Sequence, residues 1–165
     1  MPELTLRPTV AGDTEELLRI HRTPQVRRWW GEPDTGFPSD DDPNATRWTI
    51  ELDGAIAGLV QFAEEPEPRY RHASIDIFLD PAWHGRGLGT QVVQRVVAHL
   101  MTTRGHHRIT IDPAAANRAA IRAYEKAGFS PVGVMRSYER DVDGGGWHDG
   151  LLMELVAAPC SKTGL

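Results

Sequence analysis

The stretch that decides the fold is Pro81-Ala82-Trp83-His84-Gly85-Arg86-Gly87-Leu88-Gly89-Thr90. Before it, residues 73–79 alternate between apolar and polar side chains, which is the pattern of a strand that Pro81 ends. After it, apolar residues recur with helical spacing from Leu88 to Leu100, which is typical of a helix that buries one stripe. A run of closely spaced glycines therefore lies where a strand ends and a helix begins.

The beginning of this helix is suited to binding an anion. Its first N–H groups have no partner inside the helix, the helix dipole is positive there, and glycines let a ligand approach the backbone closely. The glycine spacing G-x-G-x-G differs from the G-x-G-x-x-G of dinucleotide-binding folds, and no Gly-Lys-Ser/Thr follows as in a P-loop. We interpret the stretch as a phosphate or pyrophosphate site; read alone, it is also compatible with a tight turn that binds nothing.

Length and composition indicate a single soluble domain. The chain has 165 residues, of which 40% are hydrophobic, and this suffices for one core. It shows no membrane-spanning apolar run and no signal-peptide pattern, so we expect a cytoplasmic protein. The only cysteine, Cys160, excludes an internal disulfide and a cysteine-rich zinc site, and the scattered histidines form no metal-binding pattern.

The net charge of −5 bears on the partner. Acidic residues cluster at residues 40–42 and 64–67, whereas nucleic acid binding calls for a basic face. The charge favours a small cationic substrate, although each acidic cluster can also be a solvated loop.

The order of elements predicts an α+β (mixed α/β) fold. We expect a strand, two helices, three antiparallel strands, the helix after the glycine loop, a strand, a helix and two final strands. Asp13 is expected to cap the first helix, Asp53-Gly54 to turn a hairpin, and Gly128 to end the last helix. We predict one domain over residues 1–157 and a disordered tail over residues 158–165.

Residues 117–129, Asn-Arg-Ala-Ala-Ile-Arg-Ala-Tyr-Glu-Lys-Ala-Gly-Phe, resemble the signature N-x-x-A-x-x-x-Y-x-K-x-G-F of the GNAT acetyltransferases. The glycine loop resembles that family's R/Q-x-x-G-x-G/A, with His84 in place of Arg or Gln. The resemblance implies the GNAT fold, a central mixed, mostly antiparallel sheet with flanking helices, and it implies acetyl-CoA as co-substrate.

The resemblance also implies a set of cofactor-binding residues. The strand that carries Asp76 is expected to splay from its neighbour, so that backbone N–H groups near Leu79 face the thioester carbonyl. Asn117 can contact the cofactor or simply cap its helix, and Tyr124 can give a proton to the departing thiolate or simply pack. The full predicted set is Phe78, Leu79, His84, Gly85, Arg86, Gly87, Leu88, Gly89, Thr90, Asn117 and Tyr124.

Three further stretches resemble the aminoglycoside 6'-N-acetyltransferases: Trp29-Trp30-Gly31, Ser74-Ile75-Asp76 and Ile111-Asp112-Pro113. That resemblance implies an aminoglycoside substrate and a role in antibiotic resistance. Adjacent tryptophans cannot share one helix face, so we expect one to pack inward and the other to form a groove wall. The predicted substrate-binding residues are Trp29, Trp30, Gln61, Asp76, Asp112 and Asp143.

We expect direct transfer in a ternary complex, with Tyr124, Asp112 and Asp76 as the catalytic residues. In its strand Asp76 must be paired or line a cleft, and a structural hydrogen bond is the alternative to a catalytic role. For Asp112 the alternative is a local turn before Pro113. Two other functions stay open: acetylation of another amine (a peptide N-terminus, a polyamine or a siderophore lysine), and a non-catalytic acyl-CoA-binding module. The chain is expected to act as a monomer or homodimer.

Overall fold

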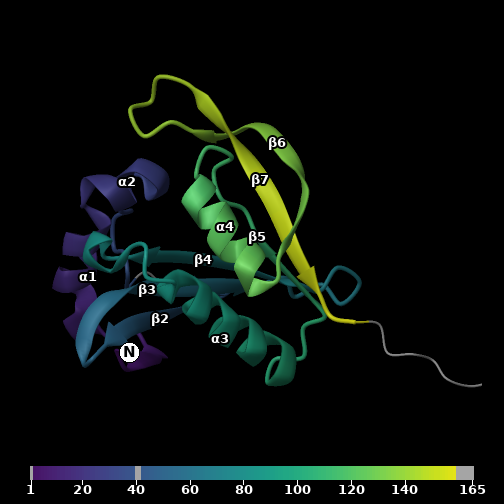
Figure 1. Ribbon diagram of the computed structural model, residues 1–165, viewed down its shortest axis with the longest axis horizontal. Coiled ribbons are helices and arrows are strands. Elements are labelled where there is room, and N and C mark those ends of the chain that lie inside the picture. The colour runs from purple at the N-terminus through teal and green to yellow at the C-terminus, as the bar shows by residue number, and fades with distance from the viewer. Residues whose placement is uncertain (1, 40–41, 159–165) are drawn as a thin grey trace, which may run out of the picture.

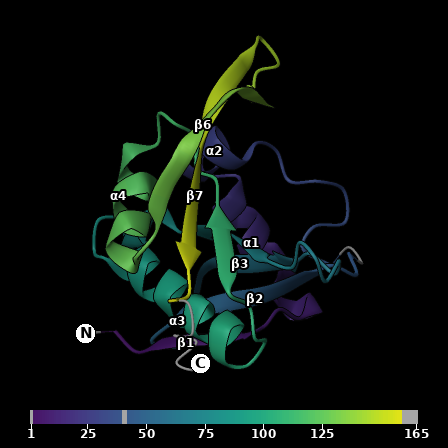
Figure 2. The ribbon, with the colours of Figure 1, turned by 90° about the vertical axis from the view of Figure 1, so that its right-hand side faces the viewer.

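The computed structural model describes residues 2–39 and 42–158 and shows one seven-stranded sheet in the order β1-β2-β3-β4-β5-β7-β6 (Figure 1). Neighbouring strands pair antiparallel, except β4 and β5, which are parallel. Helices α3 and α4 cover one face and α1 and α2 lie on the other (Figure 2). The predicted central mixed, mostly antiparallel sheet with flanking helices is confirmed.

The elements follow the predicted order. The strands are β1 (Leu4–Pro8), β2 (Ala45–Leu52), β3 (Ala55–Glu64), β4 (Ala73–Leu79), β5 (Arg108–Ile111), β6 (Ser130–Arg140) and β7 (Trp147–Val156). The helices are α1 (Thr14–His21), α2 (Pro24–Trp30), α3 (Leu88–Thr102) and α4 (Arg118–Ala127), with short 3-10 turns η1 (Ala11–Asp13) and η2 (Pro81–Trp83). The sequence did not reveal the two 3-10 turns.

Local signals explain several boundaries. Asp53 and Gly54 turn the β2–β3 hairpin, and both have positive φ, of 49° and 81°. Asn117 caps α4 by accepting a hydrogen bond from Ala120 N at 3.2 Å, and Gly128 ends α4 with φ of 110°. Asn117 therefore fulfils the capping alternative, whatever else it contacts.

The expected cap at Asp13 is wrong. The Asp13 side chain makes no capping bond to α1. Its carboxylate instead accepts hydrogen bonds from Arg7, from Thr49 Oγ1 at 2.8 Å and from Val10 N at 3.0 Å. The bonds from Arg7 hold the pKa of Asp13 well below its usual range, so this buried carboxylate joins β1, η1 and β2 rather than starting a helix.

The main core lies between the sheet and α3. The apolar stripe of α3 packs on the inward side chains of β3, β4, β5 and β7, with which it forms one buried cluster. A second cluster lies under α1 and α2 and includes Phe37, Leu59 and Phe78. Side chains of β4 are buried on both faces of the sheet, and this packing fixes the direction of the strand at its C-terminal end.

Two predictions fall partly outside the described residues: the acidic cluster at Asp40 and Asp41, and the tail with Cys160. Among residues 2–39 and 42–158, no helix is long and apolar enough to cross a membrane.

Candidate active site

The parallel pair β4 and β5 separates after two residues. Its pairing is limited to Ala73 with Ile109 and Ser74 with Thr110, although β4 continues to Leu79. Figure 1 shows β5 and β7 diverging from β4 beyond this point. The second half of β4 thus presents an edge without a strand partner, as expected for the strand that carries Asp76.

Backbone polar groups of this edge point into the gap. Asp80 N donates to Ala57 O at 2.7 Å, so the backbone N–H of Asp80 points toward β3. Along a strand the backbone polar groups point alternately to the two sides, and those of Leu79 and Ile77 therefore point away from β3. Their carbonyl groups accept bonds from elsewhere: Ile77 O from Trp30 Nε1 at 3.2 Å and Leu79 O from His84 Nε2 at 2.9 Å. The N–H groups of Leu79 and Ile77 therefore point to the space where β5 is missing, and there they can donate to a carbonyl oxygen.

The glycine loop is fixed to the end of β4 by two short-range bonds. His84 Nε2 donates to Leu79 O, and Asp80 accepts from Ala82 N at 3.0 Å, which caps η2. Gly85 and Gly87 have φ of 74° and 76°, a conformation that other residues rarely adopt, and open space lies where their side chains would be. The N-terminus of α3 thus stays accessible to an anion.

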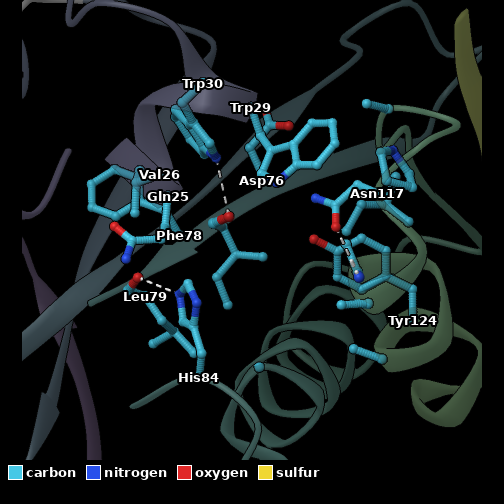
Figure 3. A pocket seen from close by; sticks show the side chains of 18 of the residues that line it. Gln25, Val26, Trp29, Trp30, Asp76, Phe78, Leu79, His84, Asn117 and Tyr124 are labelled. Carbon is cyan, nitrogen blue, oxygen red and sulfur yellow. Dashed lines mark hydrogen bonds between the residues drawn. The ribbon is translucent and has the colours of Figure 1, made fainter. Parts of the chain in front are cut away.

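A cavity of about 1330 Å³ runs from this loop past β4 and α4 to α2 (Figure 3). Its lining carries charge of both signs, with Arg28, Arg122 and Lys126 among the cations and Asp76, Asp112 and Glu139 as the anions. Figure 3 shows Trp30 and His84 bonded to β4 on one side of the cavity, and Asn117 and Tyr124 on the other. The open amides of the loop, the basic side chains of α4 and the gap beside β4 together fit an acyl-CoA.

Asp76 is open to the cavity but crowded by protein atoms on its other sides. This burial, together with the negative charge of Asp112, raises the pKa of Asp76 to about 6. Gln61 Nε2 donates to Asp76 Oδ2 at 3.5 Å, and Gln61 Oε1 accepts from Arg47 Nε at 3.0 Å. A carboxyl with a pKa near neutrality can take up a proton from an amine and release it again.

Asp112 follows β5 and faces the same cavity. Its Oδ2 accepts a hydrogen bond of 2.6 Å from the Tyr138 hydroxyl. Among the described residues Asp112 accepts no side-chain-to-backbone bond of the local turn type considered from the sequence. Its carboxylate is available to a ligand in the cavity.

Tyr124 is buried on α4 and lines the cavity. Burial, reinforced by the charges of Asp76 and Asp112, raises the pKa of Tyr124 well above its ordinary value. The phenol is therefore protonated at neutral pH, which is the form that can donate a proton to a thiolate.

The tandem tryptophans divide as expected. Trp30 packs edge-on against Phe78, with ring centroids 5.0 Å apart, and bonds to Ile77 O. Trp29 forms part of the cavity wall, where Arg28 stacks on its ring at 4.5 Å. One ring thus supports β4 and the other faces the cavity.

The structure brings most of the predicted site residues to this cavity, but three lie elsewhere. Gln61 reaches it only through Asp76, and Arg86 stacks on Trp83 at 5.1 Å instead of lining it. Asp143 lines a separate cavity of about 390 Å³ between α2 and the β6–β7 hairpin. The predicted site residues that do line the cavity are Trp29, Trp30, Asp76, Phe78, Leu79, His84, Gly85, Gly87, Leu88, Gly89, Thr90, Asp112, Asn117 and Tyr124.

Sequence reasoning missed other residues of the cavity, above all Tyr138 and Glu139 on β6, and Arg122 and Lys126 on α4. The two α4 residues were within reach, because they lie on the face of α4 that carries Ala119 and Ala123. Nothing local marks Tyr138, since it reaches the cavity only through an irregular pairing of β6 with β7.

Comparison with known proteins identifies the class. The Acetyltransferase (GNAT) family matches residues 12–129. The chain therefore belongs to the GNAT acetyltransferases, and it is an N-acetyltransferase that uses acetyl-CoA as acetyl donor.

Two kinds of relative stand out. An aminoglycoside N(6')-acetyltransferase type 1 of Klebsiella pneumoniae is 41% identical over 155 residues, covering 80% of this chain and 76% of the relative. A spermidine N(1)-acetyltransferase of Escherichia coli K12 is 29% identical over 137 residues, covering 78% and 73%.

Solved structures confirm the fold. Aminoglycoside acetyltransferase AAC(6')-Ib bound to coenzyme A and kanamycin superposes with a TM-score of 0.76 at 24% identity, covering 93% of this chain and 95% of that one. Spermidine N-acetyltransferase of Vibrio cholerae bound to coenzyme A and spermine gives 0.77 at 21% identity, with the same coverage.

Proposed function

We propose that this acetyltransferase transfers the acetyl group of acetyl-CoA to the 6'-amine of an aminoglycoside and thereby confers resistance. The observation that carries the proposal is the pair of carboxylates, Asp76 and Asp112, in one cavity walled by Trp29. Two anions that face one space favour a ligand with more than one ammonium group. The Klebsiella pneumoniae relative, at 41% identity, supports the same substrate class.

The cofactor supplies the acetyl thioester, and its place is proposed from the loop. Amides of residues 85–90 hold the pyrophosphate at the N-terminus of α3, whereas His84 N donates to Pro81 O; basic groups of α4 add positive charge nearby. The N–H groups of Leu79 and Ile77 stabilise negative charge that develops on the carbonyl oxygen.

Proton transfer is assigned to three side chains. Asp112 holds an ammonium group of the substrate by charge, and Asp76 accepts the proton of the reacting amine, directly or through water. Tyr124 returns a proton to the departing sulfur. No side chain is acylated, because transfer is direct between the two bound ligands.

Acetylation of a polyamine is the second candidate. The Escherichia coli spermidine acetyltransferase is the observation that favours it. A linear polyamine also carries several ammonium groups, so the acidic cavity suits both. The two substrate classes differ in shape. The rings of an aminoglycoside can pack on the aromatic wall at Trp29, whereas a flexible polyamine has no flat face to place on it.

The deciding experiment follows thiol release from acetyl-CoA with kanamycin, another 6'-amino aminoglycoside, spermidine and a peptide amine. We expect kcat/KM for kanamycin to exceed that for spermidine by at least tenfold, and mass spectrometry of the product to place the acetyl group on the 6'-nitrogen. Faster turnover of spermidine would transfer the assignment to polyamines. Cofactor binding without turnover of any amine would favour a non-catalytic module.

A further inference from the structure

Tyr138 lies at the acidic end of the cavity, although it belongs to the far edge of the sheet. Its hydroxyl donates to Asp112 Oδ2 at 2.6 Å. Strand β6 is the edge strand, and β7 lies between it and β5, after which Asp112 comes. The Tyr138 ring must therefore cross β7 to make this bond.

The pairing of β6 with β7 is interrupted at this place. Between the pairs Met135–Gly150 and Glu139–His148, β6 advances by four residues while β7 advances by two. The surplus residues form a bulge, in which Ser137 takes φ of 47°, a conformation that costs free energy in a residue other than glycine. Ser137 N donates to Asp149 Oδ1 at 2.9 Å, which ties the bulge to β7.

The crossing point on β7 is a glycine. A Cβ atom added to Gly150 would lie 2.8 Å from Tyr138 Cδ1, a separation that such atoms do not adopt. The bulge turns Tyr138 toward β7, and Gly150 leaves the room for its ring. Both irregularities thus serve the same contact.

Packing does not account for this arrangement. Tyr138 remains 47% exposed, so it fills no core. Its bond to Asp112 raises the pKa of Tyr138 to about 12, and the hydroxyl therefore keeps its proton and donates throughout the neutral range.

We propose that Tyr138 is a positioning residue that holds one oxygen of Asp112 and leaves the other, Oδ1, directed to an ammonium group of the substrate. The inference deepens the proposed function and rests on it only where Asp112 contacts the amine. It does not depend on which amine is the substrate. Without the phenol, Asp112 is free to rotate, and the bound amine loses a fixed partner.

The test is a double-mutant cycle of Tyr138→Phe and Asp112→Asn, measured with whichever amine gives the fastest thiol release. We expect Tyr138→Phe to raise KM for the amine about tenfold, which is the scale of a hydrogen bond to a charged group, and to leave KM for acetyl-CoA unchanged. In the Asp112→Asn protein, Tyr138→Phe should change KM for the amine by less than about twofold. Tyr70→Phe is the matched control, since Tyr70 is 67% exposed and lies outside the cavity lining.

A second readout requires no substrate. Ultraviolet absorbance follows the ionisation of the tyrosines, and Asp112→Asn should lower the pKa of the Tyr138 phenol from about 12 toward the ordinary value of about 10, whereas Tyr124 titrates at higher pH. Adding Tyr138→Phe should abolish that shift. Equal effects of Tyr138→Phe in both backgrounds, or no phenol shifted by Asp112→Asn, would overturn the inference. If the enzyme acetylated another amine but not kanamycin, the proposed substrate would be overturned, and the inference about Tyr138 would still be tested with that other amine.

Discussion

Among the single residues of the site, Asp76 is expected to determine how the reaction rate depends on pH. With its pKa raised to about 6, it is a carboxylate only above that pH, and only the carboxylate accepts a proton from the amine. We predict that kcat/KM for the amine, which reports the free enzyme, rises with pH through about 6 and then levels off. The pH profile of Asp76→Asn, whose remaining activity should lack this step, is the control; a wild-type rate that is flat between pH 5 and 8 would argue against Asp76 as the base.

The same carboxyl reduces stability. Because the pKa of Asp76 is higher in the folded protein than in the unfolded chain, its contribution to stability is present at low pH and is lost as the pH rises from about 4 to about 6. We expect Asp76→Asn to lower kcat by about 100-fold or more and to stabilise the fold at pH 7 by roughly 1 kcal/mol, a figure reduced for the solvent that reaches the side chain. Thermal unfolding at pH 4 and pH 7 measures it; an unchanged stability at pH 7 would contradict the cause given for the pKa.

Tyr124 has a role in proton transfer that a substitution can separate from packing. Replacing it by Phe removes the proton and leaves the ring, so we predict that kcat falls by about 100-fold while acetyl-CoA binding, measured by calorimetry, changes by less than about twofold. If kcat stayed the same, Tyr124 would be a packing residue, as the sequence alone allowed.

At the scale of elements, the course of β4 depends on a close approach of β3. A Cβ atom added to Gly58 would lie 2.2 Å from Phe78 O, just before the residue whose N–H points into the gap. We predict that Gly58→Ala displaces the end of β4, destabilises the fold by roughly 2 kcal/mol and raises KM for acetyl-CoA.

Gly133→Ala is the matched control, because Gly133 also lies in a strand and nothing is within 4 Å of its added Cβ. Denaturant unfolding and initial rates compare the two variants. Equal behaviour of Gly58→Ala and Gly133→Ala would show that the β3–β4 contact does not set the position of Leu79.

The Asp13 network joins the first elements of the chain. Since Arg7 lowers the pKa of Asp13, the network contributes stability above the unfolded-state pKa of about 4, and that contribution is lost as the pH falls further. We predict that Asp13→Asn costs roughly 2–3 kcal/mol at pH 7 and much less near pH 2, measured by denaturant unfolding at both pH values. Glu16→Gln, in an exposed ion pair with Arg19, should stay within about 0.5 kcal/mol; a similar loss in both variants would refute the role of Asp13.

At this scale, the sequence predicted those features that residues close together in the chain determine. The strand before the glycine loop, the helix after it and both ends of α4 are set by neighbouring residues, and all were predicted close to their observed bounds. Asp13 was misjudged because its partners Arg7 and Thr49 come from other elements, and a carboxylate before a helix looks the same in either role. Tyr138 was missed for the same reason, since its path depends on a register shift against β7 and on Gly150.

For the whole molecule, the sheet has two halves that separate where the chemistry is proposed. Strands β1–β4 are paired with strands β5–β7 only through the first two residues of β4, which pair with β5. The cavity occupies the opening beyond this pairing. Basic groups line it on α4, and acidic groups line it where β4, β5 and β6 converge, so an anionic cofactor and a cationic amine have complementary places. The family motifs made the fold predictable, whereas the polarity of the cavity required the structure.

One measurement tests most directly whether acetyl-CoA is held at the glycine loop. In a titration of the labelled protein with coenzyme A, the backbone amide NMR signals of residues 84–90, together with that of Leu79, should show the largest shifts. The amides of Asp13 and Thr49, in the network remote from the cavity lining, should stay in place. Saturating coenzyme A that leaves the signals of residues 84–90 unmoved while others shift would contradict the account.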